Sequence, residues 1–515
     1  MNFVVSTKED MEAWAELGNP GWDWENFSRY LRRTYTVTTG SETANDGTIQ
    51  TNIPDEETKW PQVWRDTLAG LGFPAHNDPF SGTIHGAVMY PDAIHPETKT
   101  RSFAGNAYLA PARDRPNLTV WTSITVEKIL FGNPSADGVA IASGVQYTTK
   151  EGNSLTVVAR KEVILSAGVF HTPKLLELSG IGDAALLSSL GIDVVVDNPY
   201  VGENLQHHPL SILSFETVDD NTPGFDTIDA LARQDPTALR AAMSDFTHSR
   251  GPFSQTNCNA MAHLPFPSIT TPSGKADLSQ LLTTTPNPSP PASKSTPAYT
   301  HFATALTHNT LTSPTAASGY YVTIPGRAQP GPSGRMMPIP STSSEKYFAI
   351  ALLLTRPLSR GSAHLTTTTT TTTPNSGQQQ QQAIDPGYLS HPLDVEVLAR
   401  HVRFLEETLV RAEPLASRLK QGGKRTPPGT EFEGDLEKVR AFLRETAVAS
   451  MLYAGTCSMM PREIGGVVDP ALRVYGTKNV RVVDASVMPF ITTGDTMATV
   501  YGIAEKAAEI IKGEL

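Results

Sequence analysis

The residues best suited to carry chemistry lie in the C-terminal stretch that begins at Leu452. Val480–Val483 is a short, apolar, β-branched run, which predicts a buried parallel strand. The run ends at the small polar group Asp484-Ala485-Ser486. Ligands in open α/β sheets bind just beyond the carboxyl ends of the strands. A ligand site is therefore expected at this turn.

A carboxylate, Asp495, stands just ahead of a predicted helix. From Thr496 onward, apolar residues recur at helical spacing, at Met497, Val500, Tyr501, Ala504 and Ala508. Aspartate is a favoured N-cap residue, and a helix N-terminus presents free N–H groups and the positive end of the helix dipole. Asp495 is therefore expected to act either as a helix cap or, where burial raises its pKa toward neutrality, as a proton acceptor.

Other patterns predict the elements that position these residues. Val163–Gly168 is typical of a strand entering a turn, and Thr172-Pro173 then predicts the start of a helix with Thr172 as its N-cap. Between Asp10 and Arg33, two short helices are expected on either side of Gly18–Gly21. Alternating runs predict strands over 117–131, 139–147 and 155–165, and helical spacing predicts helices over 394–407 and 436–445.

Composition limits the class of protein. A chain of 515 residues can hold two large domains, and its net charge of −11 argues against a nucleic-acid partner. No apolar run approaches the length of a membrane span, and the first residues lack the features of a signal peptide, so the compartment stays open. Cys258 and Cys457 cannot make a disulfide framework. The pair His207-His208 has no carboxylate or cysteine at ligand spacing, so no metal site is predicted.

Four segments together resemble the glucose–methanol–choline (GMC) oxidoreductases. They are the block 11–22, the block 101–112, the run 201–209, and the C-terminal stretch with Gly455-Thr456-Cys457-Ser458-Met459-Met460 and Asn479-Val480-Arg481-Val482-Val483-Asp484-Ala485. The resemblance covers most of the chain and is strongest toward its two ends. It implies a flavoprotein of the fungal branch, whose members often serve secondary metabolism, that binds FAD and oxidises a small-molecule alcohol. The oligomeric state is not indicated.

The resemblance also implies an α/β (α+β) two-domain fold. We expect a discontinuous FAD-binding domain at residues 1–25, 91–210 and 447–515, and a lid or edge segment at 26–90. Residues 211–446 are expected to form the substrate domain, a mostly antiparallel sheet covered by helices. The threonine and glutamine tracts at 366–382 are interpreted as an insertion at the tip of a hairpin of the substrate-domain sheet, where long loops cost little.

One element of the family's pattern has no counterpart in the sequence. Relatives hold the FAD pyrophosphate with a strand–Gly-x-Gly-x-x-Gly–helix unit that precedes the segment matched by Asn2, and this sequence contains no Gly-x-Gly-x-x-Gly. The expectation is an incomplete Rossmann-like domain without its first βαβ unit. Either the sequence is truncated or this relative is naturally shortened.

The same resemblance assigns the candidate site residues. It places FAD contacts at Asn2, Val126, Asp484, Ala485, Thr496 and Met497. The family's catalytic pair is a histidine three residues before the glycine matching Gly455, and a histidine or asparagine after the glycine matching Gly494. Here these positions hold Leu452, which cannot exchange a proton, and Asp495. An alignment with a two-residue gap near Tyr453 removes the histidine as well. Tyr453 is the only other nearby side chain that can exchange a proton, and its pKa is ordinarily near 10. It is the second candidate catalytic residue beside Asp495.

Three functions remain open at this point. The first is an FAD-dependent alcohol dehydrogenase or oxidase in which Asp495 replaces the usual pair. The second is a non-redox enzyme similar to versicolorin B synthase, which keeps FAD structurally and catalyses a dehydrative cyclisation. The third is a non-catalytic, truncated homologue.

Overall fold

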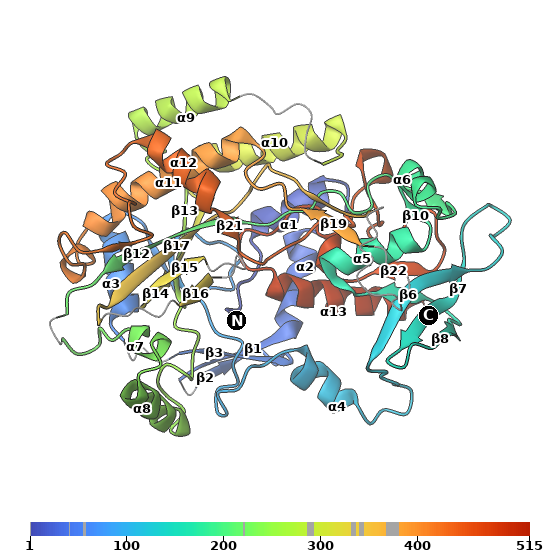
Figure 1. Cartoon of the computed structure of the whole chain (residues 1–515), viewed down its shortest axis with the longest axis horizontal. Coiled ribbons are helices and arrows are strands. Elements are labelled where there is room, and N and C mark those ends of the chain that lie inside the picture. Colours follow the sequence, from blue (N-terminus) through green and yellow to red (C-terminus); the bar gives the residue numbers. More distant parts are fainter. Residues whose placement is uncertain are drawn as a thin grey trace.

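Two sheet-based halves lie side by side in the protein (Figure 1). The computed structural model describes residues 2–40, 42–54, 58–219, 222–285, 293–330, 336–338, 344–366 and 381–514. Strands and helices are mixed in both halves, which confirms the expected α/β two-domain fold class. The expected domain boundaries stay a prediction.

The larger half is built on an eight-stranded sheet. Its order is β20-β12-β17-β14-β13-β5-β4, with β21 paired to β12, and within it only β4 and β5 run parallel. The strands are β4 (Ala75–His76), β5 (Gly86–Met89), β12 (Pro209–Glu216), β13 (Ala260–Leu264), β14 (Gly319–Ile324), β17 (Tyr347–Leu354), β20 (Arg425–Thr426) and β21 (Val448–Ala449). This sheet is the mostly antiparallel one that the sequence predicts.

The two faces of this sheet pack against different parts of the chain. Because successive side chains of a strand point to opposite faces, Ala260 and Ala262 of β13 face one side, and Met261 and His263 face the other. Ala260 and Ala262 join a core with the covering helices, whereas Met261 packs with Val4. The helices of this half are α3 (Trp60–Gly70), α9 (Pro272–Thr284), α10 (Pro297–Thr312), α11 (Pro392–Glu407) and α12 (Leu436–Thr446). We call the two sides the helix-covered face and the Val4 face.

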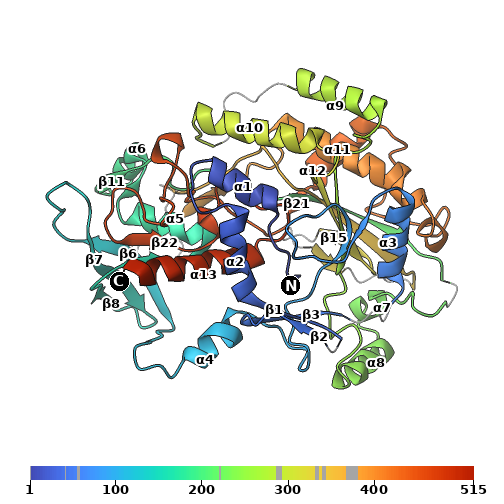
Figure 2. The same cartoon turned by 180° about the vertical axis from the view of Figure 1, so that it is seen from behind.

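The smaller half centres on the parallel pair β9 (Val163–Leu165) and β22 (Val480–Val482). Its helices are α1 (Lys8–Glu16), α2 (Trp24–Thr34), α5 (Gly168–Leu178), α6 (Ala184–Ser189) and α13 (Met497–Glu514), and Figure 2 shows α13 crossing α2. Its other strands are the meander β6 (Ile124–Phe131), β7 (Ala142–Thr149) and β8 (Ser154–Val158), and the pair β10 (Ile181–Gly182) and β11 (Val196–Asp197). The two predicted N-terminal helices and the strand at Val480–Val483 are confirmed.

The prediction that a helix opens at Thr172-Pro173 is wrong. α5 begins at Gly168, so Pro173 lies inside it. Proline cannot donate to the carbonyl four residues earlier, that of Val169. The Thr456 hydroxyl donates to this oxygen instead, at 2.6 Å. Thr172 does not cap the helix, because its hydroxyl donates to Asp484 at 2.6 Å.

The prediction of one strand over 155–165 is also wrong. The segment forms β8, which pairs antiparallel with β7, and β9, which pairs parallel with β22. The charged residues Arg160-Lys161-Glu162 separate them. The run is therefore divided at these charged residues, and its two parts pair with different sheets.

Short elements complete the described chain. They are β1 (Tyr35–Thr39), β2 (Glu42–Ala44), β3 (Ile49–Ile53), α4 (Ala110–Ala112), α7 (Asp229–Ala232), α8 (Pro236–Thr247), β15 (Ala328–Pro330), β16 (Met336–Pro338), β18 (Ser362–Leu365) and β19 (Gln382–Asp385). β18 and β19 form the predicted hairpin, but they make a two-stranded sheet of their own and are not part of the large sheet as expected. Nearly all of the tract between them lies outside the described residues. Among the described helices, none is long and apolar enough to cross a membrane.

Candidate functional site

The carboxyl ends of β9 and β22 are joined by the side chain of Asp484. One of its oxygens accepts hydrogen bonds from the Gly168 N–H at 3.0 Å and the Thr172 hydroxyl, and the other accepts from Ser486. Gly168 adopts a φ of +80°, and nothing lies within 4 Å of the place where a Cβ would stand. The Asp484 carboxylate therefore holds an open turn at the strand ends, where α/β sheets bind ligands.

Asp495 stands at the end of the loop that follows β22 and precedes α13. The helix begins at Met497, so Thr496 occupies the N-cap position and Asp495 lies one residue outside it. Its side chain keeps partial solvent exposure, yet crowding by protein raises its pKa to about 6 through desolvation. No hydrogen bond or ion pair joins its carboxylate to another residue in the described ranges. Asp495 is thus an unpaired carboxyl group with a pKa near neutrality.

The loop that carries Asp495 packs on the Val4 face of the large sheet. A Cβ added to Gly494 would stand 2.3 Å from Val4 Cγ1 and 3.9 Å from His263 Cε1. The buried His263 ring stacks on Tyr320, and its Nε2 lies 3.1 Å from the Tyr90 hydroxyl oxygen. Burial lowers the pKa of His263 to about 3, so the imidazole is neutral. It raises the pKa of Tyr90 well above its usual value, with a further contribution from the Asp495 charge.

Sequence reasoning missed this polar cluster on the sheet. A histidine at the fourth position of Ala-Met-Ala-His-Leu in β13 was the available signal, since the alternation assigns it to the same face as Met261. His208, predicted to be buried and structural, is fully buried, and its Nδ1 lies 2.8 Å from the Leu354 carbonyl oxygen. No group of three or more histidine, cysteine or acidic side chains suited to a metal occurs in the described residues.

Tyr453 lies in a different environment from Asp495. Its hydroxyl is 3.1 Å from that of Tyr388, and its ring contacts Phe170 and His207. Within the described chain, no hydrogen bond or ring contact connects Tyr453 to Asp495. The structure does not bring the two candidate catalytic residues into contact.

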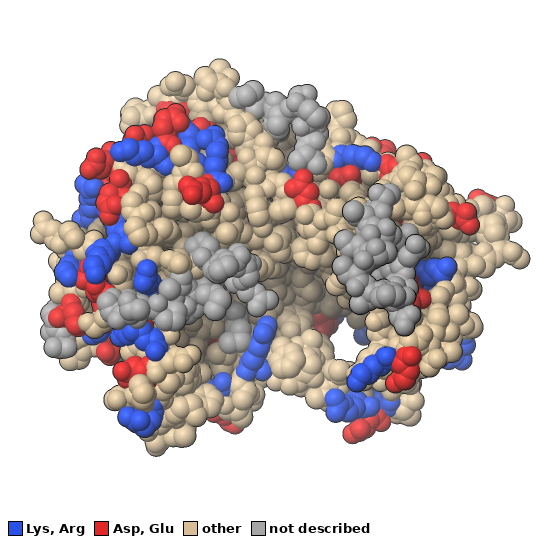
Figure 3. Space-filling view, viewed as in Figure 1, with Lys and Arg blue, Asp and Glu red and all other residues tan. Residues whose placement is uncertain are grey.

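The predicted cofactor contacts form an accessible set and a buried set. Val126 of β6 is 38% exposed, and Ala485 and Met497 are partly exposed. Asn2 and Thr496 are buried, and the Asn2 amide donates to Asp92, Thr256 and Cys258. An opening passes through this part of the molecule in Figure 3, at the place where Figure 1 shows α13, α4 and β6.

The accessible set leaves surface that a ligand could contact. Val126, Ala485 and Met497 leave apolar surface open near the strand ends, and the unobstructed Gly168 turn allows a ligand to approach the backbone there. Val120 and Trp121, just before β6, are also exposed. Val126, Ala485, Met497 and Gly168 are accessible, so the expected FAD contacts at Val126, Ala485 and Met497 stay a prediction.

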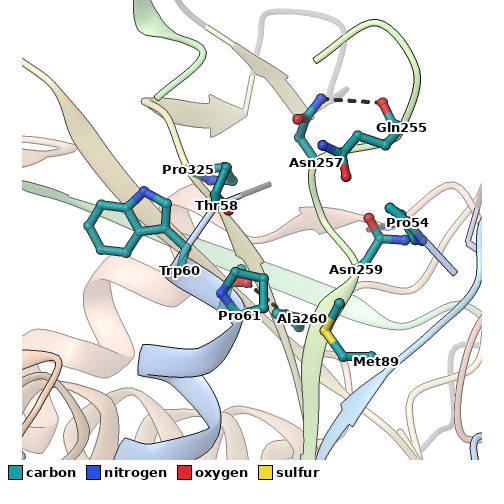
Figure 4. Close-up of a pocket in the computed structure, with 11 residues that line it drawn as sticks. Pro54, Thr58, Trp60, Pro61, Met89, Gln255, Asn257, Asn259, Ala260 and Pro325 are labelled. Atoms are coloured by element: carbon teal, nitrogen blue, oxygen red, sulfur yellow. Dashed lines mark hydrogen bonds between the residues drawn. The ribbon is translucent and has the colours of Figure 1, made fainter. Parts of the chain in front are cut away.

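A separate pocket of about 480 Å³, its open mouth included, lies on the helix-covered face of the sheet. Figure 4 shows Trp60 and Pro61 of α3 on one side of it, and Gln255 and Asn257 of the loop before β13 on the other. Met89 and Ala260, which pair with each other, supply part of its wall. Asp495 packs near the Val4 face, so the sheet separates this pocket from Asp495.

Comparisons with known proteins find relatives over most of the chain. Two family models, both described as GMC oxidoreductase, match residues 1–210 and 357–504. A dehydrogenase of Monascus purpureus, mpl7, is 33% identical over 99% of this chain and 81% of its own length. A GMC oxidoreductase family protein of Malassezia sympodialis is 30% identical over 99% of this chain and 77% of its own.

Solved structures show the same fold. An FAD-dependent oxidoreductase of Chaetomium thermophilum matches all of this chain and 84% of its own, with a TM-score of 0.82 and 26% identity. A fungal aryl-alcohol oxidase matches with the same coverage, a TM-score of 0.81 and 25% identity. The N-terminal family match extends over residues 1–210, so the comparisons do not confirm the expected lack of a first βαβ unit.

Proposed function

Because the chain belongs to the GMC oxidoreductase family, and is accordingly an FAD-dependent oxidoreductase, we propose that it oxidises the CH–OH group of a small-molecule alcohol with Asp495 as the proton acceptor. The observation that carries this proposal is the unpaired, partly exposed Asp495 carboxyl group with its pKa of about 6. A base works best when its pKa lies near the working pH. Secondary metabolism is the setting we propose for the substrate.

The geometry around Asp495 supports a specific division of labour. Bound FAD would supply the acceptor for the hydride of the alcohol carbon. The Asp495 carboxylate accepts the hydroxyl proton, while the neutral His263 and Tyr90 beside it neither compete for that proton nor add charge. Tyr453, bonded to Tyr388, stays the second candidate and would act on a part of the substrate away from Asp495.

The solved fungal aryl-alcohol oxidase makes benzylic alcohols the first compounds to test. The FAD-loaded protein is mixed anaerobically with aromatic and aliphatic primary alcohols, and the flavin absorbance is followed. Bleaching by one compound class, with the matching aldehyde as product, is the expected result. An FAD-loaded protein that no alcohol bleaches would contradict the proposal. If such a protein nevertheless dehydrated or cyclised a substrate, the non-redox alternative would replace it.

A further inference from the structure

Asp10 of α1 makes more contacts than a helix cap needs. One carboxylate oxygen accepts hydrogen bonds from the Thr7 N–H and the Thr493 N–H, both at 2.9 Å. The other accepts from the Thr493 hydroxyl at 2.8 Å and from Arg356 Nη2 at 2.7 Å. Only the bond from Thr7 belongs to the capping box of α1. The remaining three join parts of the chain that are distant in sequence.

The ion pair between Asp10 and Arg356 is deeply buried. Their side chains are 1% and 8% exposed. Removing one partner of such a pair leaves an uncompensated charge in the interior, which is costly. Arg356 follows β17 of the large sheet, whereas Thr493 belongs to the loop between β22 and α13. The Asp10 carboxylate on α1 therefore binds both the end of the large sheet and the loop that carries Asp495.

The same loop is held at neighbouring positions by other elements. Trp14 Nε1, one turn along α1, donates to the Phe490 carbonyl at 3.0 Å. The Gln206 side chain accepts from the Ile491 N–H at 3.2 Å and donates to the Pro489 carbonyl at 3.0 Å. After Thr493, Gly494 lies against Val4 with no room for a side chain. The backbone up to Asp495 is thus fixed on several sides.

Asp495 itself depends on this framework. Its carboxylate has no partner among the described residues, so the backbone of the loop sets its position. Thr493, two residues earlier, donates hydrogen bonds to the Asp10 carboxylate from both its N–H and its hydroxyl. A displacement of about 1 Å in a reacting group can lower a rate about 100-fold. A small shift of Thr493 on loss of the Asp10 contact would therefore move the Asp495 carboxylate far enough to change its reactivity.

We propose that Asp10, with its charge balanced by Arg356, is the positioning residue for Asp495. Its grip on Thr493 directs the Asp495 carboxylate toward the substrate without any direct contact between the two acids. This inference rests on the proposed role of Asp495 as proton acceptor.

A double-mutant cycle tests the coupling. D10N replaces an acceptor oxygen with an N–H₂ group that faces the donors of Thr493 or Arg356. We expect kcat for flavin reduction to fall about 10- to 100-fold in the FAD-loaded D10N protein, with KM nearly unchanged. Because Asp10 acts through Asp495, the D10N/D495N protein should be no slower than D495N alone. The matched control is D23N, which removes the N-cap carboxylate of α2 and should leave kcat unchanged.

Other outcomes distinguish a failure of the proton-acceptor role of Asp495 from a failure of the positioning role of Asp10. If D495N keeps full activity, the proposed proton acceptor is wrong, whatever D10N does. If D495N is slow and D10N is fast, or if the two losses multiply in the double variant, the positioning role is overturned. Should D10N not fold, T493V and T493S take its place: T493V, which lacks the hydroxyl, should lower kcat several-fold, and T493S should restore it. Equal rates for these two variants would also overturn the proposal.

Discussion

At the scale of single residues, Asp495 is the group whose replacement should change the chemistry most directly. D495N keeps the shape of the side chain and removes its capacity to accept a proton. General base catalysis contributes about 10²- to 10⁴-fold, so kcat for flavin reduction should fall by at least about 100-fold, with FAD content unchanged. Stopped-flow absorbance measures the rate. D66N, on the exposed surface of α3, serves as the matched control, and a D495N rate equal to the D66N rate would contradict the assignment.

The pKa of Asp495 also sets the expected pH dependence. The carboxylate form accepts the proton, and it predominates above the pKa of about 6. The value of kcat/KM for flavin reduction should therefore rise between about pH 5 and 7 and level off above, with an apparent pKa near 6. Rate profiles of the wild type and D495N from pH 5 to 9 check this. A rate that falls as the pH rises through 6 would assign the limiting proton to a different group.

At the scale of elements, helix α5 depends on a single hydroxyl from the C-terminal stretch. The carbonyl of Val169, which Pro173 leaves without its helical donor, accepts from Thr456. T456V keeps the shape and removes this donor; the Thr456 side chain is fully buried, whereas Val169 is partly exposed. The free energy of unfolding should drop by about 1 kcal/mol, the typical net contribution of one hydrogen bond. Thermal unfolding measures the loss, T456S should recover most of it, and equal stability of T456V and the wild type would refute it.

The hairpin β18–β19 is joined to α5 by a histidine between two buried acids. His364 Nδ1 lies 2.7 Å from Glu177 and its Nε2 lies 3.1 Å from Glu203. Burial alone would lower the pKa of His364, but the two carboxylates raise it to about 9. The folded-state pKa lies above the unfolded value of about 6.5, so the ion pairs stabilise fully below pH 6.5 and lose that effect as the pH rises through 9.

The variant H364Q tests this link. It should lower the free energy of unfolding by at most about 3 kcal/mol at pH 6, the linkage value of the pKa shift. The difference from the wild type should shrink toward pH 9.5. Thermal unfolding at a series of pH values shows the trend, and H248Q, on an exposed histidine at the end of α8, is the control. A deficit that does not vary with pH would show that His364 acts by packing alone.

Sequence patterns predicted the elements whose structure follows from their own residues. They failed where hydrogen bonds from side chains distant in sequence determine where an element begins. The run at Val480–Val483 gave a parallel strand, Val480–Val482, because its β-branched residues suit a buried sheet. The start of α5 could not be predicted, because Asp484 and Thr456, roughly 300 positions away, replace the local capping signals at Thr172-Pro173. The grip of Asp10 on Thr493 joins residues 483 positions apart, so no local pattern reveals it. Asp495 was found by its place in a motif, but only the fold shows that it is unpaired.

At the scale of the whole molecule, FAD would connect segments that the described chain leaves separated by an opening (Figure 3). A ligand that binds only the folded state stabilises it in proportion to the logarithm of its concentration, by about 2.7 kcal/mol at 100 times Kd. Added FAD should therefore raise the unfolding temperature by a few degrees in a concentration-dependent way. Differential scanning fluorimetry over a range of FAD concentrations measures this shift.

The variant V126D tests whether FAD raises the unfolding temperature by binding next to β6. Val126 is 38% exposed, so a charge there should cost little stability without FAD and should reduce the shift that FAD produces. V158D is the matched control, because Val158 is 77% exposed on β8, a neighbouring part of the same meander, and is not among the expected contacts. Equal responses of V126D and V158D to FAD would move the cofactor away from β6. A full response in V158D with a weakened one in V126D would place FAD between the meander and the strand ends that carry Asp484 and the turn at Gly168.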